Sequence, residues 1–549
     1  MKWSRYYHTL RYVPIRRSLQ RIWFKLHWPQ PDLRPAPPLR SPSALNWIRL
    51  PLRRPVMLSP TRFRLLNEEF EVQTEADWSA ADRKFLWNLN LHYFEDLIAE
   101  NVEKRREWHR TLIEKWISQN PPGPTIGWEP YPLSLRICNW IKWALADNEL
   151  SDRARHSLVV QARFLRQRYD RHLLGNHLLV NAKAFIFAGL FFDGAEAAKW
   201  YQKGMAILRQ QVPEQILSDG GHFERSPMYH NLMTEDFLDL LNILRVYGRD
   251  GDFIWQEELA RMLHWAQALC HPDGQIALFN DAAFEIAPTS AQLLEYAHKL
   301  GLSPARFDGR SDALLQSSGY IRACRGPAVL FADVGPVGPD YLPGHGHADT
   351  LSFELSLHGR RAIVDSGTSI YQMGAERLRQ RGTAAHNTLQ VDGQDSSEVW
   401  SSFRVARRAR ITETRIEQAS TFRLMASHNG YGRLQRVGDH RRTCTLSLDH
   451  LDIEDEIEGS GEHEIRLAFH LHPQWRVASA PNGRFELMPR EPNPNLRSPL
   501  RLEMDPKFSC QIIPTTYHPE FGLSIPNQKI LGVYRGNLPV KFATFLSWS

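Results

Sequence analysis

Residues 344–365 read GHGHADTLSFELSLHGRRAIVD, and this stretch decides how the C-terminal half of the chain is interpreted. From Leu351 to Leu357, apolar residues alternate with serine and glutamate, which is the period of a half-buried strand. His358-Gly359 then turns the chain, and residues 361–364 return. The stretch therefore predicts an antiparallel hairpin directly after a histidine-rich loop.

The same alternation recurs further along the chain, at 444–448 and at 465–469, so residues 306–549 are predicted to form an antiparallel β-sandwich. Upstream, residues 61–305 follow helical spacing instead. Residues 85–100 are expected to begin the helical region, and 176–192 is apolar nearly all round, which predicts a helix packed between others. The result is an α+β multidomain chain, with a helical domain followed by a β domain.

Residues 1–60 are basic and rich in proline, which predicts an N-terminal arm followed by a linker. The first 30 residues contain no apolar core of the kind a secretion signal needs, so a cytoplasmic protein is expected, with the periplasm as the alternative. The basic arm has a second interpretation, which is contact with a membrane surface.

Composition excludes several classes of protein. An aromatic content of 11% argues against disorder throughout the chain. No apolar stretch approaches ~18 residues, so no transmembrane helix is predicted. Five cysteines without a CxxC pair argue against a disulfide framework and favour a reducing compartment. A formal charge of +6 permits a polyanionic partner, but no zinc-finger spacing, P-loop or RNP motif points to nucleic acid.

Polar residues gather in a few short segments. DGGHFERSPMYH at 219–230 is too polar for a core, and Tyr229 within it can act as a general acid or base. Asn176 either caps a helix or hydrogen-bonds a substrate carboxylate. His345 and His347 lie two apart on an extended segment, so one is expected to face a cleft and the other to face inward.

Two further patterns bear on ligands. Whichever of His345 and His347 faces inward could join Asp365 and His386 in a zinc site with nitrogen and oxygen ligands, and water would be the fourth ligand. Eleven of the seventeen tryptophans lie in residues 1–150, among them Trp128. Indole rings suit sugar rings, although core packing is the simpler explanation for any one of them.

Five segments together resemble the heparinase II/III-like superfamily of polysaccharide lyases, over roughly residues 80–500. This resemblance implies an incomplete (α/α) toroid followed by an antiparallel β-sandwich. It also implies cleavage of a uronic-acid-containing polysaccharide by β-elimination, which leaves a 4,5-unsaturated uronate end. The segments are GHGHADTLSFEL at 344–355, AIVDSGTSIY at 362–371, RGTAAHNTLQVDG at 381–393, GNHLLVNAKA at 175–184 and DGGHFERSPMYH at 219–230.

The resemblance also assigns roles to residues. Asn176, with His177 beside it, is expected to neutralise the uronate carboxylate. Tyr229 and His345 are expected on opposite walls of the cleft as base and acid, with the assignment depending on the stereochemistry of the uronate. A structural metal site, usually zinc, maps to His347, Asp365 and His386, and no organic cofactor is implied. Further contacts with the acidic substrate are expected from Arg136, Arg225, Trp128 and His230.

Two alternatives remain at this point. The first is a non-lytic glycan-binding or exopolysaccharide-assembly protein on the same fold. Because the chain has a basic arm instead of a clear signal peptide, it resembles the subgroup of the superfamily associated with bacterial surface polysaccharides. The second is a glycoside hydrolase, for which Asp219 and Glu224 are the nearest carboxylate pair. A lyase product carries a new double bond, whereas a hydrolase product does not.

Overall fold

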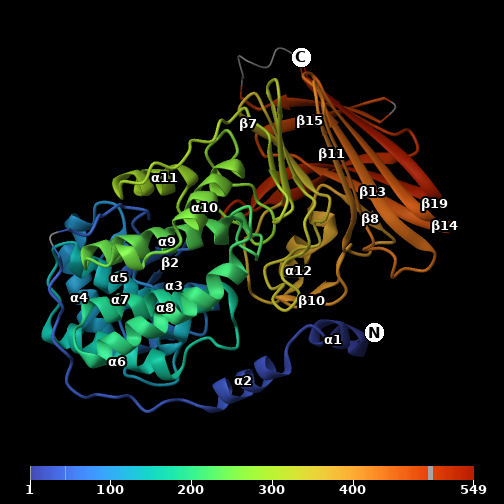
Figure 1. Cartoon of the computed structure of the whole chain (residues 1–549). Coiled ribbons are helices and arrows are strands. Elements are labelled where there is room, and N and C mark those ends of the chain that lie inside the picture. Colours follow the sequence, from blue (N-terminus) through green and yellow to red (C-terminus); the bar gives the residue numbers. More distant parts are fainter. Residues whose placement is uncertain (1, 44, 482, 492–498, 549) are drawn as a thin grey trace.

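The structure is a computed structural model that describes residues 2–43, 45–481, 483–491 and 499–548. Figure 1 shows a helical body and a β-rich body side by side, with the N-terminal arm running along the outside of both. The helical body ends with α11 (Ser290–Lys299), and the β-rich body begins with β3 (Ala313–Leu315). Within the described part of the chain, no helix combines the length and apolarity needed to cross a bilayer.

The helical domain is organised around α7 (Gly175–Phe191), the helix predicted from the apolar run at 176–192. Its side chains are buried on nearly every side, because it packs against α5, α6, α8 and α9. The helices of this domain are α3 (Phe85–Leu91), α4 (Arg106–Gln119), α5 (Pro130–Leu145), α6 (Asp152–Gln167), α7, α8 (Ala195–Gln215), α9 (Pro227–Val246), α10 (Gln256–Ala268) and α11, with 3-10 turns at Glu75–Ser79, Glu95–Ile98, Val102–Arg105, Ile126–Trp128 and Asp250–Asp252.

Two details of the helical region differ from the prediction. The helix expected over 85–100 is interrupted, because α3 ends at Leu91 and Phe94 takes a left-handed conformation before a short 3-10 turn. The region also opens with a hairpin, β1 (Arg62–Leu65) and β2 (Glu68–Glu71), whose two turn residues both have positive φ. Strands of four residues are too short to show a clear period in the sequence.

In the described residues, the β domain contains two large antiparallel sheets and a separate two-stranded pair, Val399–Trp400 with Arg404–Val405. The smaller sheet has the order β3-β4-β5-β6-β7, and the larger one has the order β11-β12-β13-β14-β19-β17-β16-β15, with β18 paired to β19 and β8 paired to β14. The remaining bounds are β4 (Tyr320–Arg325), β5 (Ala328–Asp333), β6 (Phe353–Leu357), β7 (Arg360–Ile363), β8 (Leu389–Val391), β9 (Val399–Trp400), β10 (Arg404–Val405), β11 (Ile411–Gln418), β12 (Phe422–His428), β13 (Val437–Leu446), β14 (His450–His470), β15 (Trp475–Ala480), β16 (Arg484–Pro489), β17 (Leu500–Met504), β18 (Ser509–Tyr517) and β19 (Ile525–Ser547), with helix α12 at Ala375–Arg381 and a 3-10 turn at Thr383–Ala385.

The two sheets share one apolar core. Leu330 and Leu355 of the smaller sheet belong to the same buried cluster as Leu451 and Leu467 of the larger one. The predicted hairpin is β6-β7, with Leu357 opposite Arg360 and the turn at His358-Gly359. The prediction of an antiparallel β-sandwich is therefore confirmed.

The arm touches both domains (Figure 1). Helix α1 (Lys2–Leu10) lies against the β domain, where Arg407 donates a hydrogen bond of 2.8 Å to the Ser4 hydroxyl. Helix α2 (Ile15–Leu26) lies against the helical domain, where the Arg168 guanidinium stacks on the Phe24 ring at 3.5 Å. The following proline-rich segment continues along the helical domain, where the Arg40 amide donates to the carbonyl of Phe191 at 3.0 Å.

A buried ion cluster links the sandwich to the loop that precedes β6. The Arg442 guanidinium binds both oxygens of Asp455, at 2.8 and 2.9 Å, and also donates to the backbone carbonyls of Leu351 and Asn387. His440 lies 2.7 Å from the same carboxylate. Burial opposes ionisation of Asp455, yet the Arg442 charge and the hydrogen bond from His440 hold its pKa well below the ordinary value.

We expect Asp455→Ala to destabilise the β domain by about 3–5 kcal/mol, because the variant leaves the Arg442 charge buried without its partner. Urea unfolding followed by near-ultraviolet circular dichroism measures the change. Asp452→Ala is the control on the same strand, since its side chain is 43% exposed; we expect a change within about 0.5 kcal/mol. Equal effects of the two substitutions would contradict the role of the cluster.

Candidate active site

A cavity of about 1370 Å³ lies where the two domains and the arm meet. Asn176, His177 and Tyr229 line it from the helical domain, and His345 lines it from the β domain. Aromatic and cationic side chains complete the lining, among them Tyr93, Tyr131, Tyr341, Phe403, Arg17, Arg21, Lys84 and Arg404. Such a mixture suits an elongated molecule with flat apolar faces and negative groups.

Asn176 is held at the start of α7 by a carboxylate. Its backbone amide donates to Glu224 at 3.0 Å, and its side-chain amide donates to both Glu224 oxygens at 3.1 Å. Gly175 has φ +57°, and a Cβ there would lie 2.3 Å from a Glu224 oxygen, so only glycine fits this approach. His177 is next to this pair, with its side chain 34% exposed and its ring 4.4 Å from that of Tyr131.

Tyr229 and His345 come from different domains but are in direct contact. Their ring centroids lie 4.0 Å apart with an interplanar angle of 33°. The expectation that they lie on opposite walls of the cleft is therefore wrong for this arrangement. The Tyr229 hydroxyl is also 3.2 Å from the hydroxyl of Tyr371, and burial raises the pKa of both phenols, so both are protonated.

Asp281 orients His345. One Asp281 oxygen lies 2.9 Å from His345 Nδ1, and the other lies 2.9 Å from His347 Nε2. The Arg377 guanidinium binds both oxygens, at 2.5 and 2.7 Å, so the fully buried carboxylate is compensated by charge. With Nδ1 of His345 bonded in this way, Nε2 is the nitrogen left for chemistry, and it lies 3.4 Å from Glu224.

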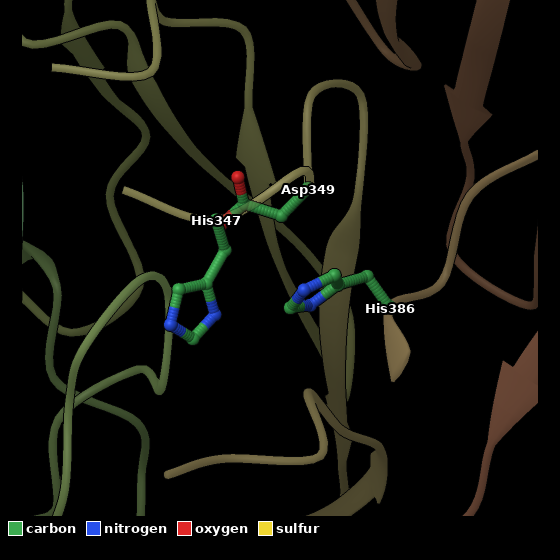
Figure 2. Close-up of side chains that lie close together, drawn as sticks. All are labelled: His347, Asp349 and His386. Carbon is green, nitrogen blue, oxygen red and sulfur yellow. The ribbon is translucent and has the colours of Figure 1, made fainter. Parts of the chain in front are cut away.

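A second cluster lies behind this one, within the β domain. His347, Asp349 and His386 are all buried, and one potential ligand atom of each lies within 4.8 Å of the others. Figure 2 shows the three side chains arranged round one space. His347 Nδ1 and His386 Nε2 are buried without a hydrogen-bond partner, which is the state expected of nitrogens reserved for a metal ion.

The other nitrogen of each histidine is held by a carboxylate, because His347 Nε2 bonds Asp281 and His386 Nδ1 lies 2.6 Å from Asp365. This is the arrangement in which outer carboxylates orient metal-binding imidazoles. The structure thus brings together His347 and His386 as predicted, but it groups Asp349 with them and places Asp365 on the outer side of His386. Burial lowers the pKa of His347 to about 4, so this ring is neutral and able to ligate.

The structure contradicts the substrate contacts predicted for four residues. Trp128 is 1% exposed in the helical core, and the Arg136 guanidinium stacks on Trp116 at 3.8 Å. His230 bonds the Met262 carbonyl at 2.9 Å, and Arg225 donates to the carbonyl of Ser318 at 2.9 Å. None of the four belongs to the lining of the cavity. The flat and cationic side chains that suggested sugar binding are instead packed in the core or hydrogen-bonded to backbone carbonyls.

Several residues of the site were not predicted. Asp281 follows Asn280 in a segment without a distinctive pattern, and Arg377 lies on the short helix α12, so neither offered a local signal. Asp349 and Tyr371 do lie inside the quoted motifs, and their polar side chains in GHGHAD and SGTSIY were the available signal. Glu224 was considered only as a hydrolase carboxylate.

Comparison with known proteins matches both halves of the chain. Residues 44–300 match the family model described as heparinase II/III N-terminus, and residues 308–540 match the one described as heparinase II/III-like, C-terminal. A heparin-sulfate lyase of Bacteroides stercoris is 26% identical over 73% of this chain and 66% of its own length. This chain therefore covers slightly less than two thirds of that relative. The FtsZ-localized protein C of Caulobacter vibrioides is 25% identical over 75% of this chain and 73% of its own length.

Solved structures agree on the fold. A crystal structure of heparinase III superposes with a TM-score of 0.67 at 20% identity, and it covers 86% of this chain and 79% of that one. The predicted incomplete (α/α) toroid followed by a β-sandwich is thereby confirmed. The two family models together span nearly the whole chain, and the chain belongs to the heparinase II/III-like family.

Proposed function

We propose that this chain is a polysaccharide lyase that cleaves a uronic-acid-containing polysaccharide by β-elimination. The observation that carries the proposal is the meeting of Asn176, Tyr229 and His345 at one cavity, although they come from two domains. The cations of the lining suit an acidic polymer. Relatives named heparin-sulfate lyase support the reaction class.

Asn176 supplies the first requirement of the reaction. A uronate carboxylate has to be neutralised before the C5 proton becomes acidic enough to remove, and an amide donor does this as the enolate-like charge develops. In the structure Glu224 accepts the Asn176 amide, and Glu224 lies 3.4 Å from His345 Nε2. We propose that the substrate carboxylate takes over the side-chain amide when it binds, while the Asn176 backbone amide keeps its bond to Glu224.

Tyr229 and His345 supply the proton transfers. One of them removes the C5 proton, and the other protonates the leaving O4 as the C4–O4 bond breaks and the C4=C5 double bond forms. Asp281 keeps Nε2 of His345 directed away from the β domain core. Tyr371 extends the hydrogen-bonded chain from the Tyr229 hydroxyl.

The cleft does not favour the hydrolase alternative. Asp219 and Glu224 were the only nearby carboxylate pair, and Asp219 bonds the amide and hydroxyl of Ser318 at 2.7 and 2.9 Å. Asp219 does not line the cavity, whereas Glu224 does. The carboxylate pair nominated for a hydrolase therefore does not face one glycosidic bond in this cavity.

We propose zinc at His347, Asp349 and His386, with Asp365 and Asp281 as the outer carboxylates. The free nitrogens of both histidines and the adjacent carboxylate fit an N/O donor set with one position for water. Bound zinc would act as a structural ion that holds the loop carrying His345 against β8. These residues would keep that loop in place while His345 handles protons in the cleft.

Elimination is tested with a panel of acidic polysaccharides, followed by the ultraviolet absorbance of the conjugated unsaturated uronate. We expect the wild-type chain to produce absorbance on one class of polymer. Tyr229→Phe and Asn176→Ala should each lower kcat at least about a hundredfold. Tyr247→Phe is the matched control, because Tyr247 does not line the cavity.

The other outcomes separate the alternatives. New reducing ends without absorbance would favour a hydrolase. If no polymer gave absorbance or new reducing ends, but binding to a polymer were retained, a non-lytic glycan-binding protein would be favoured.

The contact between Tyr229 and His345 also predicts a stereochemical preference. Because the two rings lie side by side, both groups reach a bound sugar from the same face, which corresponds to syn elimination. Glucuronate and mannuronate carry the C5 proton and O4 on one face, whereas their C5 epimers, iduronate and guluronate, do not. We therefore expect polymers of the first pair to be cleaved faster.

Matched polymers test this preference. Unsulfated chondroitin is compared with desulfated dermatan, and polymannuronate with polyguluronate, since each pair differs only at C5. In whichever pair is cleaved, we expect the initial rate on the glucuronate or mannuronate polymer to be at least about tenfold higher than the rate on its C5 epimer. The reason is that the geometry at the reacting centre strongly affects the rate. Equal rates, or a preference for the C5 epimer, would contradict a one-sided acid–base pair.

The metal proposal is tested by measuring bound zinc per chain after zinc loading and dialysis. We expect His347→Ala, His386→Ala and Asp349→Asn to abolish binding. Asp365→Asn should retain zinc with an affinity about 10–100-fold lower, as found for outer partners of metal ligands. Loss of zinc should also lower the thermal midpoint of the wild-type chain. If the His347→Ala and His386→Ala variants both retained zinc, the proposed site would be contradicted. If Asp365→Asn lost zinc and Asp349→Asn retained it, Asp365 would be the ligand and Asp349 the outer carboxylate.

A further inference from the structure

The two helices of the N-terminal arm have an inner face that is tied to the body of the protein. Arg17 on α2 donates to the carbonyls of His172 and Leu173, at 2.6 and 2.8 Å, and also bonds the carbonyl of Tyr341. Phe24 lies seven residues further along the same side and is 9% exposed. These contacts orient α2, so its opposite side has to face solvent.

That opposite side is apolar rather than polar. On α2, Ile15, Leu19, Ile22 and Leu26 follow spacings of four, three and four, which puts them in one stripe half a turn from Arg17. They are 80%, 62%, 57% and 82% exposed, in that order. On α1, Trp3 and Tyr7 are 87% and 65% exposed at the same spacing. We call these six residues the arm face.

The arm face lies within a strongly basic segment. The chain contains no aspartate or glutamate before Asp32. Arg16 and Lys25 are exposed and flank the stripe on α2, and Arg11 is exposed between the helices. An outward apolar stripe bordered by cations is the pattern of a helix that lies in a lipid interface, with its apolar side chains below the headgroups and its cations beside anionic lipids.

We propose that the arm face binds the surface of an anionic phospholipid bilayer, with α1 and α2 lying in the plane of the interface. An acidic polysaccharide would account for the cations but not for four outward aliphatic side chains. A second copy of this chain would bring one basic segment against another, which charge opposes. A bilayer with anionic headgroups satisfies both features of the arm.

The arm also places the cleft relative to that bilayer. Arg17, Ser18 and Arg21 of α2 line the cavity, whereas the six residues of the arm face do not. A chain docked through the arm face therefore holds its cleft directly beside the membrane surface. The inference does not depend on the proposed lyase activity, because it rests on the exposure and charge of the arm.

The test is sedimentation of the full chain with vesicles of phosphatidylglycerol and phosphatidylcholine, and with vesicles of phosphatidylcholine alone. We expect binding to the anionic vesicles only. Leu19→Ser/Ile22→Ser should weaken this binding at least about tenfold, since two apolar side chains no longer enter the interface. Arg16→Glu/Lys25→Glu should weaken it at least about tenfold as well.

Ile254→Ser/Leu448→Ser is the matched control, because these side chains are 57% and 66% exposed outside the arm and the cavity. We expect it to bind vesicles like the wild type, and all variants to keep the wild-type thermal midpoint, since the inner face of α2 is unchanged. The proposal is overturned if the wild type does not bind, if it binds phosphatidylcholine equally, or if the control loses as much binding as the arm variant. It is likewise overturned if the arm variants lose binding to an acidic polysaccharide and keep binding to vesicles.

Discussion

The carboxylate of Asp281 is completely buried at the junction of the two domains, where an uncompensated charge would be very costly. The side chains that compensate this charge are therefore held in fixed positions around it. Arg377 binds both oxygens, and His345 and His347 each use one nitrogen on them. One ion-paired group thus sets the orientation of a cleft histidine and of a histidine in the proposed zinc site, so the two clusters are mechanically linked.

Two other buried carboxylates, Glu224 and Asp455, are also compensated by neighbouring polar or charged groups. Glu224 is satisfied by the amide groups of Asn176, and Asp455 by Arg442 and His440. In each case a carboxylate positions a side chain or loop that faces the cleft or supports it. Separating one of these carboxylates from its partners would leave buried polar groups unpaired, which is costly. These clusters therefore act as rigid supports for a site assembled from separate domains.

The failed substrate predictions have a common physical cause. Trp128 and Arg136 carry the flat and cationic surfaces that sugars favour, but a large helical core also uses indole rings and stacked guanidinium groups for packing. His230 and Arg225 lie in the same polar segment as Tyr229, yet their hydrogen bonds go to backbone carbonyls. Composition indicates which groups are present, whereas burial determines which of them remain free for a ligand.

Periodicity in the sequence was enough to predict a helical domain followed by a β domain, the buried helix after Gly175 and the β6-β7 hairpin, because periodicity is a local property of the chain. The motifs also identified Asn176, Tyr229 and His345 as members of one site. Three features depend on the folded arrangement of both domains: the stacking of Tyr229 on His345, the support of His345 by Asp281 and Arg377, and the grouping of Asp349 with His347 and His386. Tyr229 and His345 are 116 positions apart, Asp281 and Arg377 are 96 apart, and Asp349 and His386 are 37 apart. No local pattern encodes which distant side chains the packing of two domains brings into contact.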